Sequence, residues 1–203
     1  CIPIPCDLST EEGINDFHQY IVEKEDGIDF LINNAGAAWG EPFENFSENG
    51  WNKVMDLNVK SIFFLTQKFK SLLLKRASLD DPSRIINIGS IDGLNVPAFE
   101  TYSYSTSKAA VHHLTRVLAA KLVKENILVN AIAPGPYPSA MLGSAVNSDY
   151  SEIEKNNPRK RVGTPEDIAG LTIFLCSRAG AYTVGETITS DGGIVKTTGH
   201  NLS

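Results

Sequence analysis

The chain has 203 residues, of which 42% are hydrophobic and 21% are charged, a balance typical of a soluble globular protein with one sizeable core. Its formal net charge of −6 argues against nucleic acid as a partner, and its one basic run, Arg159–Arg161, is short. No apolar stretch has the roughly 18 residues that a membrane-spanning helix requires, so no membrane partner is expected. We therefore expect a single domain over residues 1–203.

The three cysteines, Cys1, Cys6 and Cys176, have neither the spacing of a metal site nor the even number of a disulfide framework. They predict a reducing compartment, and we expect a cytoplasmic protein. The first residues lack the charged segment that begins a signal peptide. Residues 2–6 instead resemble the end of a strand that begins before the first residue, so we interpret the chain as a fragment of a longer protein.

Helix signals follow in chain order. Ser9 and Glu12 have the spacing of a capping box and predict a helix that continues to about Glu25. A second helix is predicted over Ser47–Lys75, where apolar residues recur at helical spacing over many turns, and a third over Thr101–Glu125. Each of these helices precedes or follows a short apolar run, which indicates regular alternation of helix and strand.

The C-terminal part of the chain begins with a loop-rich region over residues 136–163. Thr164, followed by Pro165, then predicts the start of a helix that ends near Ser177. The predicted strands are residues 28–32, 84–89, 127–132 and 186–190. They are short, apolar and without period-two alternation, which favours a parallel sheet covered on both faces. The sequence therefore predicts an α/β, Rossmann-like doubly wound fold with helices on both faces of the sheet.

Polar or turn-forming residues stand just past each predicted strand. They are Asp7, Asn33, Asn34, Ser90 and the turn Pro134–Gly135. Because ligands bind outside the carboxyl ends of parallel strands, we expect these residues to gather at one edge of the sheet. That edge would face the start of the helix that begins near residue 101.

Tyr104 and Lys108 stand four residues apart on that helix, so their side chains share one face. A nearby ammonium group favours phenolate, and we expect it to lower the pKa of Tyr104 from its ordinary value of about 10. Such a tyrosine can act as a general acid or base toward a carbonyl or alcohol. Tyr102 is the competing tyrosine, but Thr106 and not a lysine stands four residues after it.

His112 and His113 are adjacent on the same helix and therefore face different directions. No third ligand stands at metal-site spacing, so we interpret both as structural or interfacial residues and predict no metal.

Seven motifs, in this order and spacing, resemble the short-chain dehydrogenase/reductase family. They are Asp7, Asn33–Gly36, Asn58, Ser90, Tyr104-x-x-x-Lys108, Asn130–Gly135 and Asp191–Gly193. The resemblance extends from Asp7 to about Ile194. It implies an oxidoreductase that interconverts a carbonyl and an alcohol with NADP or NAD, of which NADP is preferred.

The resemblance also implies a role for each matching residue. Tyr104 is the general acid or base, Lys108 lowers its pKa and holds the nicotinamide ribose, and Ser90 stabilises charge on the substrate oxygen. Asn58 helps to hold a water that relays protons to Lys108, and Ser139 stands where family members usually have threonine. The implied cofactor contacts are Asp7, Asn34, Ala35, Gly36, Tyr104, Lys108, Pro134, Gly135, Tyr137 and Ser139.

The sequence departs from the family pattern at its N-terminal end. The glycine-rich phosphate loop and the first two strands of the family fold are absent, and the segment Gly36–Gly40 lacks the third glycine. We therefore expect this chain, expressed alone, to bind nicotinamide cofactor poorly. The alternative function is a non-catalytic Rossmann-like interaction or scaffold protein, or an inactive fragment.

The expected substrate is a mostly apolar carbonyl compound, for which a 3-oxoacyl thioester is one candidate. The residues expected to line its pocket are Trp39, Leu94, Val96, Phe99, Tyr102, Tyr137, Met141 and Leu142. The two long helices carry apolar residues on more than one face, for example over Ile62–Leu65, so we expect a homodimer or homotetramer.

Overall fold

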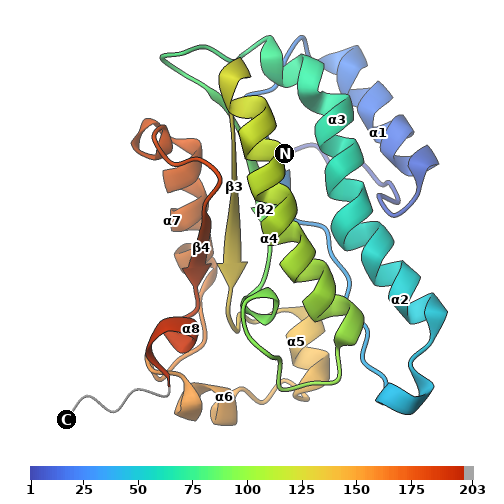
Figure 1. Ribbon diagram of the computed structural model, residues 1–203, viewed down its shortest axis with the longest axis vertical. Coiled ribbons are helices and arrows are strands. Elements are labelled where there is room, and N and C mark those ends of the chain that lie inside the picture. The colour runs from blue at the N-terminus through green and yellow to red at the C-terminus, as the bar shows by residue number, and fades with distance from the viewer. Residues whose placement is uncertain (199–203) are drawn as a thin grey trace.

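The computed structural model describes residues 1–198, in which helices cover both faces of a parallel sheet (Figure 1). The sheet of these residues has the order β1-β2-β3-β4, with every neighbouring pair parallel. Its strands are β1 (Phe30–Asn33), β2 (Ser83–Ile88), β3 (Ile127–Pro134) and β4 (Thr187–Ser190). This arrangement confirms the predicted α/β fold.

The helices alternate with these strands along the chain. They are α1 (Glu11–Lys24), α2 (Glu48–Met55), α3 (Ser61–Leu74), α4 (Tyr102–Leu122), α5 (Ala140–Ala145), α6 (Ser151–Asn156), α7 (Pro165–Cys176) and α8 (Ile194–Thr197). A π-helical segment, Asp56–Lys60, joins α2 to α3, and a 3-10 turn, Ile91–Gly93, follows β2.

One face of the sheet packs against α1, α3 and α4. Neighbouring residues of β2 point to opposite faces, and Ile85 joins this first core. Its further buried members are Ile14, Leu31, Leu65, Phe69, Leu72, Leu73, Leu118, Ala119, Leu122, Ile127 and Val129. This face therefore fixes the position of α4, which carries the predicted catalytic pair.

The opposite face of the sheet packs against α7. Ile86 of β2 and Ile132 of β3 meet Leu175 of α7 in a second, smaller core. Figure 1 shows α7 beside β4, away from α1 and α3. β1 lies at the opposite edge of the sheet from β4, and its residues Phe30 and Ile32 are 48% and 45% exposed. Since β2 is the one neighbour of β1 among the described residues, the other edge of β1 is unpaired there.

Two expectations at the N-terminal end are wrong. Residues 2–6 form no strand in the structure, where the two prolines remove backbone donors that a sheet would need. The cap of α1 is Thr10, whose hydroxyl accepts from the Gly13 N–H at 3.0 Å, and not Ser9. Ser9 instead donates from its backbone N–H to the Asp7 carboxylate at 2.9 Å.

Two further elements differ from expectation. The single helix predicted over Ser47–Lys75 is interrupted by the π-helical segment, because the register of backbone hydrogen bonds changes at Asp56–Lys60. The region predicted to be loop-rich, residues 136–163, contains the short helices α5 and α6. The predicted start of α7 is confirmed, since Asp167 accepts from the Thr164 backbone N–H at 2.8 Å.

Two adjacent leucines of α3 test the core assignment. Leu73 is fully buried, whereas Leu74 is 39% exposed. Leu73→Ala should lower the free energy of unfolding by about 2–5 kcal/mol, because it removes buried methyl groups and leaves a cavity. Leu74→Ala, measured by the same urea denaturation, should cost less than about 1 kcal/mol. Equal losses for the two variants would contradict the assignment of this helix face.

Candidate active site

Helix α4 brings the predicted catalytic pair to one face, as its sequence spacing indicated. The Nζ of Lys108 lies 5.5 Å from the centroid of the Tyr104 ring. The side of α4 that faces the protein interior is rich in small and polar residues, namely Ser103, Ser107, Lys108, His112 and Thr115. Buried polar groups require partners, so this side of the helix is built for chemistry or for specific contacts.

Lys108 is 5% exposed, and its Nζ donates to the Ile88 carbonyl at 2.8 Å, at the end of β2. Burial lowers the pKa of Lys108 to about 8, because the charged ammonium loses hydration. An ammonium group carries three N–H donors, so two stay available for a ligand after the bond to Ile88. Lys108 is therefore anchored, buried and still able to bind hydroxyl groups.

The pKa of Tyr104 is raised, which is the opposite of the sequence-based expectation. Burial of the phenol is the largest cause, the hydrogen bond with the Ser90 side chain lowers the pKa in part, and the Asp92 carboxylate raises it further. The ammonium of Lys108 lies over the Tyr104 ring, and burial lowers the pKa of Lys108 itself. Its effect on the pKa of Tyr104 is therefore smaller than the effect of desolvation. Tyr104 is therefore a protonated phenol at neutral pH, suited to donate a proton.

Ser90 follows β2 directly and is 7% exposed. Its hydroxyl accepts from the Asp92 backbone N–H at 3.1 Å and lies near enough to the Tyr104 phenol to lower the pKa of that group. The turn after Ser90 is pressed onto α4, since a Cβ on Gly93 would lie 2.5 Å from the Ala109 nitrogen. The Ser90 and Tyr104 hydroxyls thus converge and can bind one substrate oxygen together.

Asn58 lies in the π-helical segment and is 1% exposed. Its Oδ1 accepts from the Ala37 N–H at 2.8 Å, and its Nδ2 donates to the Ala37 carbonyl and the Ser107 hydroxyl, both at 2.9 Å. Both amide N–H groups are therefore used on protein partners. The side chain joins the segment after β1 to α4, and a water held by Asn58 would have to donate to Oδ1 or to the main-chain carbonyl.

The segment after β1 lies beside Lys108. A Cβ on Gly36 would be 3.3 Å from the Asn58 Oδ1 and 3.6 Å from the Lys108 Nζ. Asn34 and Ala35 line a cavity of about 320 Å³ next to the edge of β1. The structure thus places the predicted residue Gly36 beside Lys108, whereas Asn34 and Ala35 line the cavity beside β1.

Asn33 has a different role from its neighbour. It is buried and donates from Nδ2 to the Asn87 Oδ1 at 2.8 Å, and Asn87 donates to the Thr115 hydroxyl at 2.9 Å. This chain of side-chain hydrogen bonds joins β1, β2 and α4 beneath the site. Asn33 is therefore a structural residue that fixes the strand ends relative to the catalytic helix.

Asp7 is placed at the start of α1, where it receives the Ser9 backbone N–H and hydroxyl. These hydrogen bonds lower the pKa of the exposed Asp7 carboxylate. Its expected contact with the adenine side of a cofactor stays a prediction.

The ends of β3 and β4 meet at the predicted Pro134–Gly135 turn. The Gly135 N–H donates to the Ser190 carbonyl at 2.9 Å, and a Cβ on Gly135 would lie 2.8 Å from Asp191. Only glycine fits this close approach. Ser139, four residues later, caps α5 by accepting the Leu142 N–H at 3.1 Å, so its hydroxyl already has a structural partner.

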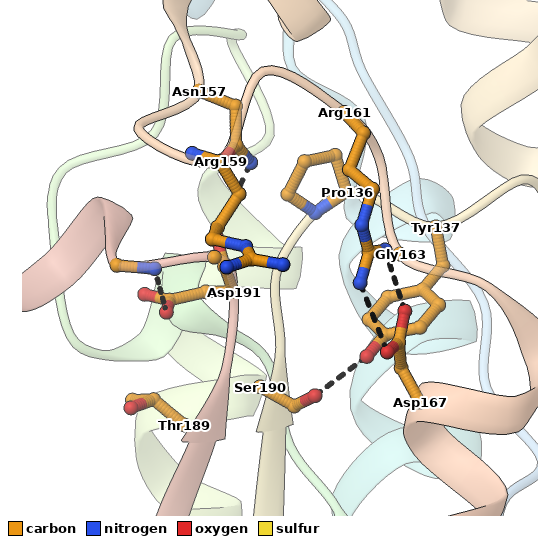
Figure 2. Close-up of a pocket in the computed structure, with 12 residues that line it drawn as sticks. Pro136, Tyr137, Asn157, Arg159, Arg161, Gly163, Asp167, Thr189, Ser190 and Asp191 are labelled. Atoms are coloured by element: carbon orange, nitrogen blue, oxygen red, sulfur yellow. Dashed lines mark hydrogen bonds and ion pairs between the residues drawn. The ribbon is translucent and has the colours of Figure 1, made fainter.

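A cavity of about 510 Å³, which the sequence did not predict, lies beside this turn, and Figure 2 shows the residues that line it. The cavity is lined by Pro136, Tyr137, Asn157, Arg159, Arg161, Gly163, Asp167, Thr189, Ser190, Asp191, Gly192 and Gly193. Arg161 forms two hydrogen bonds with Asp167, at 2.6 and 3.0 Å, and the Tyr137 hydroxyl bonds to the Ser190 hydroxyl. The sequence feature that could have indicated this cavity is the basic run Arg159–Arg161, which precedes the start of α7.

Of the residues predicted to bind substrate, some are exposed and others pack against aromatic or helical residues. Leu94 and Met141 are exposed, at 43% and 41%. Tyr102 packs edge-to-face against Phe46, with ring centroids 5.5 Å apart. Trp39 lies against α2 instead, because a Cβ on Gly50 would meet its indole at 2.3 Å.

Within residues 1–198, no three histidine, cysteine or acidic side chains gather in a way that could hold a metal ion. None of the helices in this part of the chain combines the length and apolar character that crossing a membrane requires.

Comparison with known proteins identifies similar proteins that are named as reductases or dehydrogenases. The chain matches the family model described as Enoyl-(Acyl carrier protein) reductase over residues 1–195. It is 44% identical over 196 residues to the rhamnolipids biosynthesis 3-oxoacyl-[acyl-carrier-protein] reductase of Pseudomonas aeruginosa, with 95% of this chain and 76% of the relative covered. It is 39% identical over 203 residues to a 2-dehydro-3-deoxy-D-gluconate 5-dehydrogenase of Dickeya dadantii, with 95% and 75% covered.

A solved structure extends the comparison to three dimensions. The Pseudomonas aeruginosa RhlG/NADP active-site complex matches with a TM-score of 0.90 and 42% identity, over 95% of this chain and 76% of that one. The chain belongs to the short-chain dehydrogenase/reductase family. It is an oxidoreductase, and the non-catalytic scaffold alternative is not supported.

The pKa of Lys108 predicts how activity depends on pH. Because that pKa is lowered to about 8, the ammonium is present below this pH and is lost as the pH rises through it. Carbonyl reduction should therefore fall above about pH 8, while Tyr104, whose pKa is raised, stays protonated. Initial rates from pH 6 to 10 would measure this, and a rate that stays constant to pH 10 would contradict it.

Proposed function

We propose that this chain carries the catalytic centre of a nicotinamide-dependent reductase that converts a mostly apolar ketone to an alcohol. The observation that carries the proposal is the convergence of three groups. The Ser90 hydroxyl lies beside the Tyr104 phenol and lowers its pKa, and the Lys108 ammonium lies 5.5 Å from the centroid of the Tyr104 ring. Two hydroxyls beside a buried cation fit a substrate oxygen whose charge changes during reaction.

The donor set fits the nicotinamide half of the cofactor. Lys108 keeps two N–H donors for ribose hydroxyls, and Gly36 lies beside its ammonium. NADP is the preferred cofactor, since the similar Pseudomonas aeruginosa structure is a complex with NADP. When bound, the cofactor would supply the hydride, and a substrate carbonyl at Ser90 and Tyr104 would receive it.

The residues of the chain would handle the proton. As the carbonyl carbon receives the hydride, the Tyr104 O–H donates its proton to the carbonyl oxygen, which gives the alcohol and a phenolate. The Ser90 hydroxyl donates a hydrogen bond to that oxygen and stabilises its developing charge. The Lys108 ammonium stabilises the phenolate and can return a proton to it, because its pKa of about 8 lies close to neutral.

Tyr104→Phe tests this assignment, because it removes the hydroxyl and keeps the ring. The variant should lower kcat for ketone reduction by at least ~10²-fold, the scale of a lost general acid. Circular dichroism and the denaturation midpoint should stay close to those of the parent protein. Tyr102→Phe is the matched control, since its hydroxyl bonds to Glu100, and it should retain activity within about 3-fold of the parent. Normal turnover by Tyr104→Phe would refute the proton-donor role.

The surroundings of the site favour an apolar substrate. Loop residues after β2 are strongly exposed, with Leu94 at 43%, Val96 at 94% and Phe99 at 50%. Tyr102 packs edge-to-face with Phe43, whose exposure is 70%, at a centroid distance of 5.7 Å. Exposed apolar side chains next to a catalytic centre are typical of binding surfaces. We therefore propose a 3-oxoacyl thioester as the substrate class, in agreement with the name of the Pseudomonas aeruginosa reductase.

The substrate proposal predicts a dependence on acyl-chain length. Phe99→Asp should raise KM about 10-fold for a medium-chain 3-oxoacyl thioester and far less for a four-carbon one, because only the longer chain reaches the apolar loop. Leu79→Asp, an exposed change on the loop before β2, serves as the control. The Dickeya dadantii relative is named for a sugar acid, so that substrate belongs in the panel. Preference for the sugar acid would contradict the proposal of a 3-oxoacyl thioester as substrate.

We also propose a homodimer or homotetramer. Phe63 and Phe64 of α3 are 40% and 37% exposed, and Val117 of α4 is 52% exposed. These side chains face away from the sheet and need a partner surface. Light scattering at micromolar concentration should show at least twice the monomer mass. Phe64→Glu should shift the mass toward the monomer, and a monomeric parent protein would contradict the proposal.

A cytoplasmic location is the last part of the proposal. The three cysteines are free in the structure, which agrees with a reducing compartment. Recovery of the protein outside the cytoplasmic fraction of the native cell would overturn it.

A further inference from the structure

Two side chains of α4, one helical turn apart, hold the end of β2. Lys108 donates to the Ile88 carbonyl at 2.8 Å, and the Ser90 backbone N–H donates to the Nε2 of His112 at 3.4 Å. Gly89 lies between these two contacts in the chain. The residue that bears the catalytic hydroxyl is therefore tied to α4 through its own backbone.

Gly89 has no side chain because the imidazole fills that space. A Cβ at position 89 would lie 2.1 Å from the His112 Nε2 and 2.6 Å from its Cδ2, too close for any other residue without a shift. His112 is 3% exposed, so the ring is enclosed by protein. The contact between the ring and the 89–90 backbone is thus a packed one.

The His112 imidazole is neutral at ordinary pH. The pKa of His112 is lowered to about 4: burial is the largest cause, the positive charges of Lys108 and Arg116 act in the same direction, and the Gly93 backbone opposes them. A neutral ring has one acceptor nitrogen. The Ser90 N–H points at Nε2, so the proton belongs on Nδ1.

We propose that His112 is a positioning residue for Ser90, whose backbone N–H it accepts so that the Ser90 hydroxyl stays beside the Tyr104 hydroxyl. The proposal rests on the proposed reductase function of the same site and deepens it. His112 acts through the backbone of the segment that follows β2 and is a positioning residue, not a catalytic one. A space-filling residue without an acceptor would leave the buried Ser90 N–H unpaired and the turn free to shift.

Three variants separate positioning from simple packing. His112→Leu fills the space without an acceptor, His112→Gln restores an acceptor near the position of Nε2, and His113→Leu changes the exposed neighbour that contacts Arg116. For reduction of a 3-oxoacyl thioester, His112→Leu should lower kcat about 10-fold with KM within about 2-fold. His112→Gln should recover most of the loss, and His113→Leu should stay within about 2-fold of the parent. Equal activity of the Leu and Gln variants at position 112 would overturn the proposal.

A second measurement does not depend on activity. In cofactor-free protein, the Ser90 amide should be protected from hydrogen exchange in the parent and in His113→Leu. The same amide should exchange faster in His112→Leu. The imidazole nitrogen shifts of the parent protein should show the neutral Nδ1–H form, and an Nε2–H form would refute the contact even if His112→Leu fails to fold. If the exchange result holds while the parent reduces no carbonyl compound, the contact stands and the proposed reaction fails.

Discussion

The attachment of α4 to the end of β2 is the constraint on which the rest of the site depends. The Lys108 ammonium is buried and bonded to the Ile88 carbonyl at 2.8 Å, while the Gly93 turn is pressed onto the helix backbone. An isolated buried ammonium is costly, so its position is set by the few acceptors it can reach. That anchor fixes Tyr104 one turn earlier on the helix, and Ser90 two residues after Ile88.

The polar residues around Lys108 form a hydrogen-bond network that holds the site in place, and they are not further catalytic residues. Asn58 joins the segment after β1 to Ser107 of α4, and Asn87 joins Asn33 to α4 through the Thr115 hydroxyl. Such networks rigidify a site because every buried donor needs its partner in place. The π-helical segment belongs to this support, since it presents Asn58 toward the loop and α4 together.

The electrostatics of the site follow from burial more than from charge pairing. Desolvation raises the pKa of Tyr104 and lowers those of Lys108 and His112. The phenol therefore keeps its proton, the lysine lies near its titration point, and the histidine is neutral. This combination favours donation of a proton to a carbonyl oxygen, the direction that a reductase needs.

The sequence by itself determined the alternation of strands and helices, the parallel sheet, the start of α7 and the Tyr104–Lys108 face, because these depend on local periodicity and capping. Only the tertiary structure decided the direction of the Tyr104 pKa, the π-helical interruption and the placement of Trp39 against Gly50. It also decided the contact of His112 with the Ser90 backbone, for which spacing on one helix gave no signal. Desolvation and contacts between distant segments arise only when the chain is packed, so no local pattern can report them.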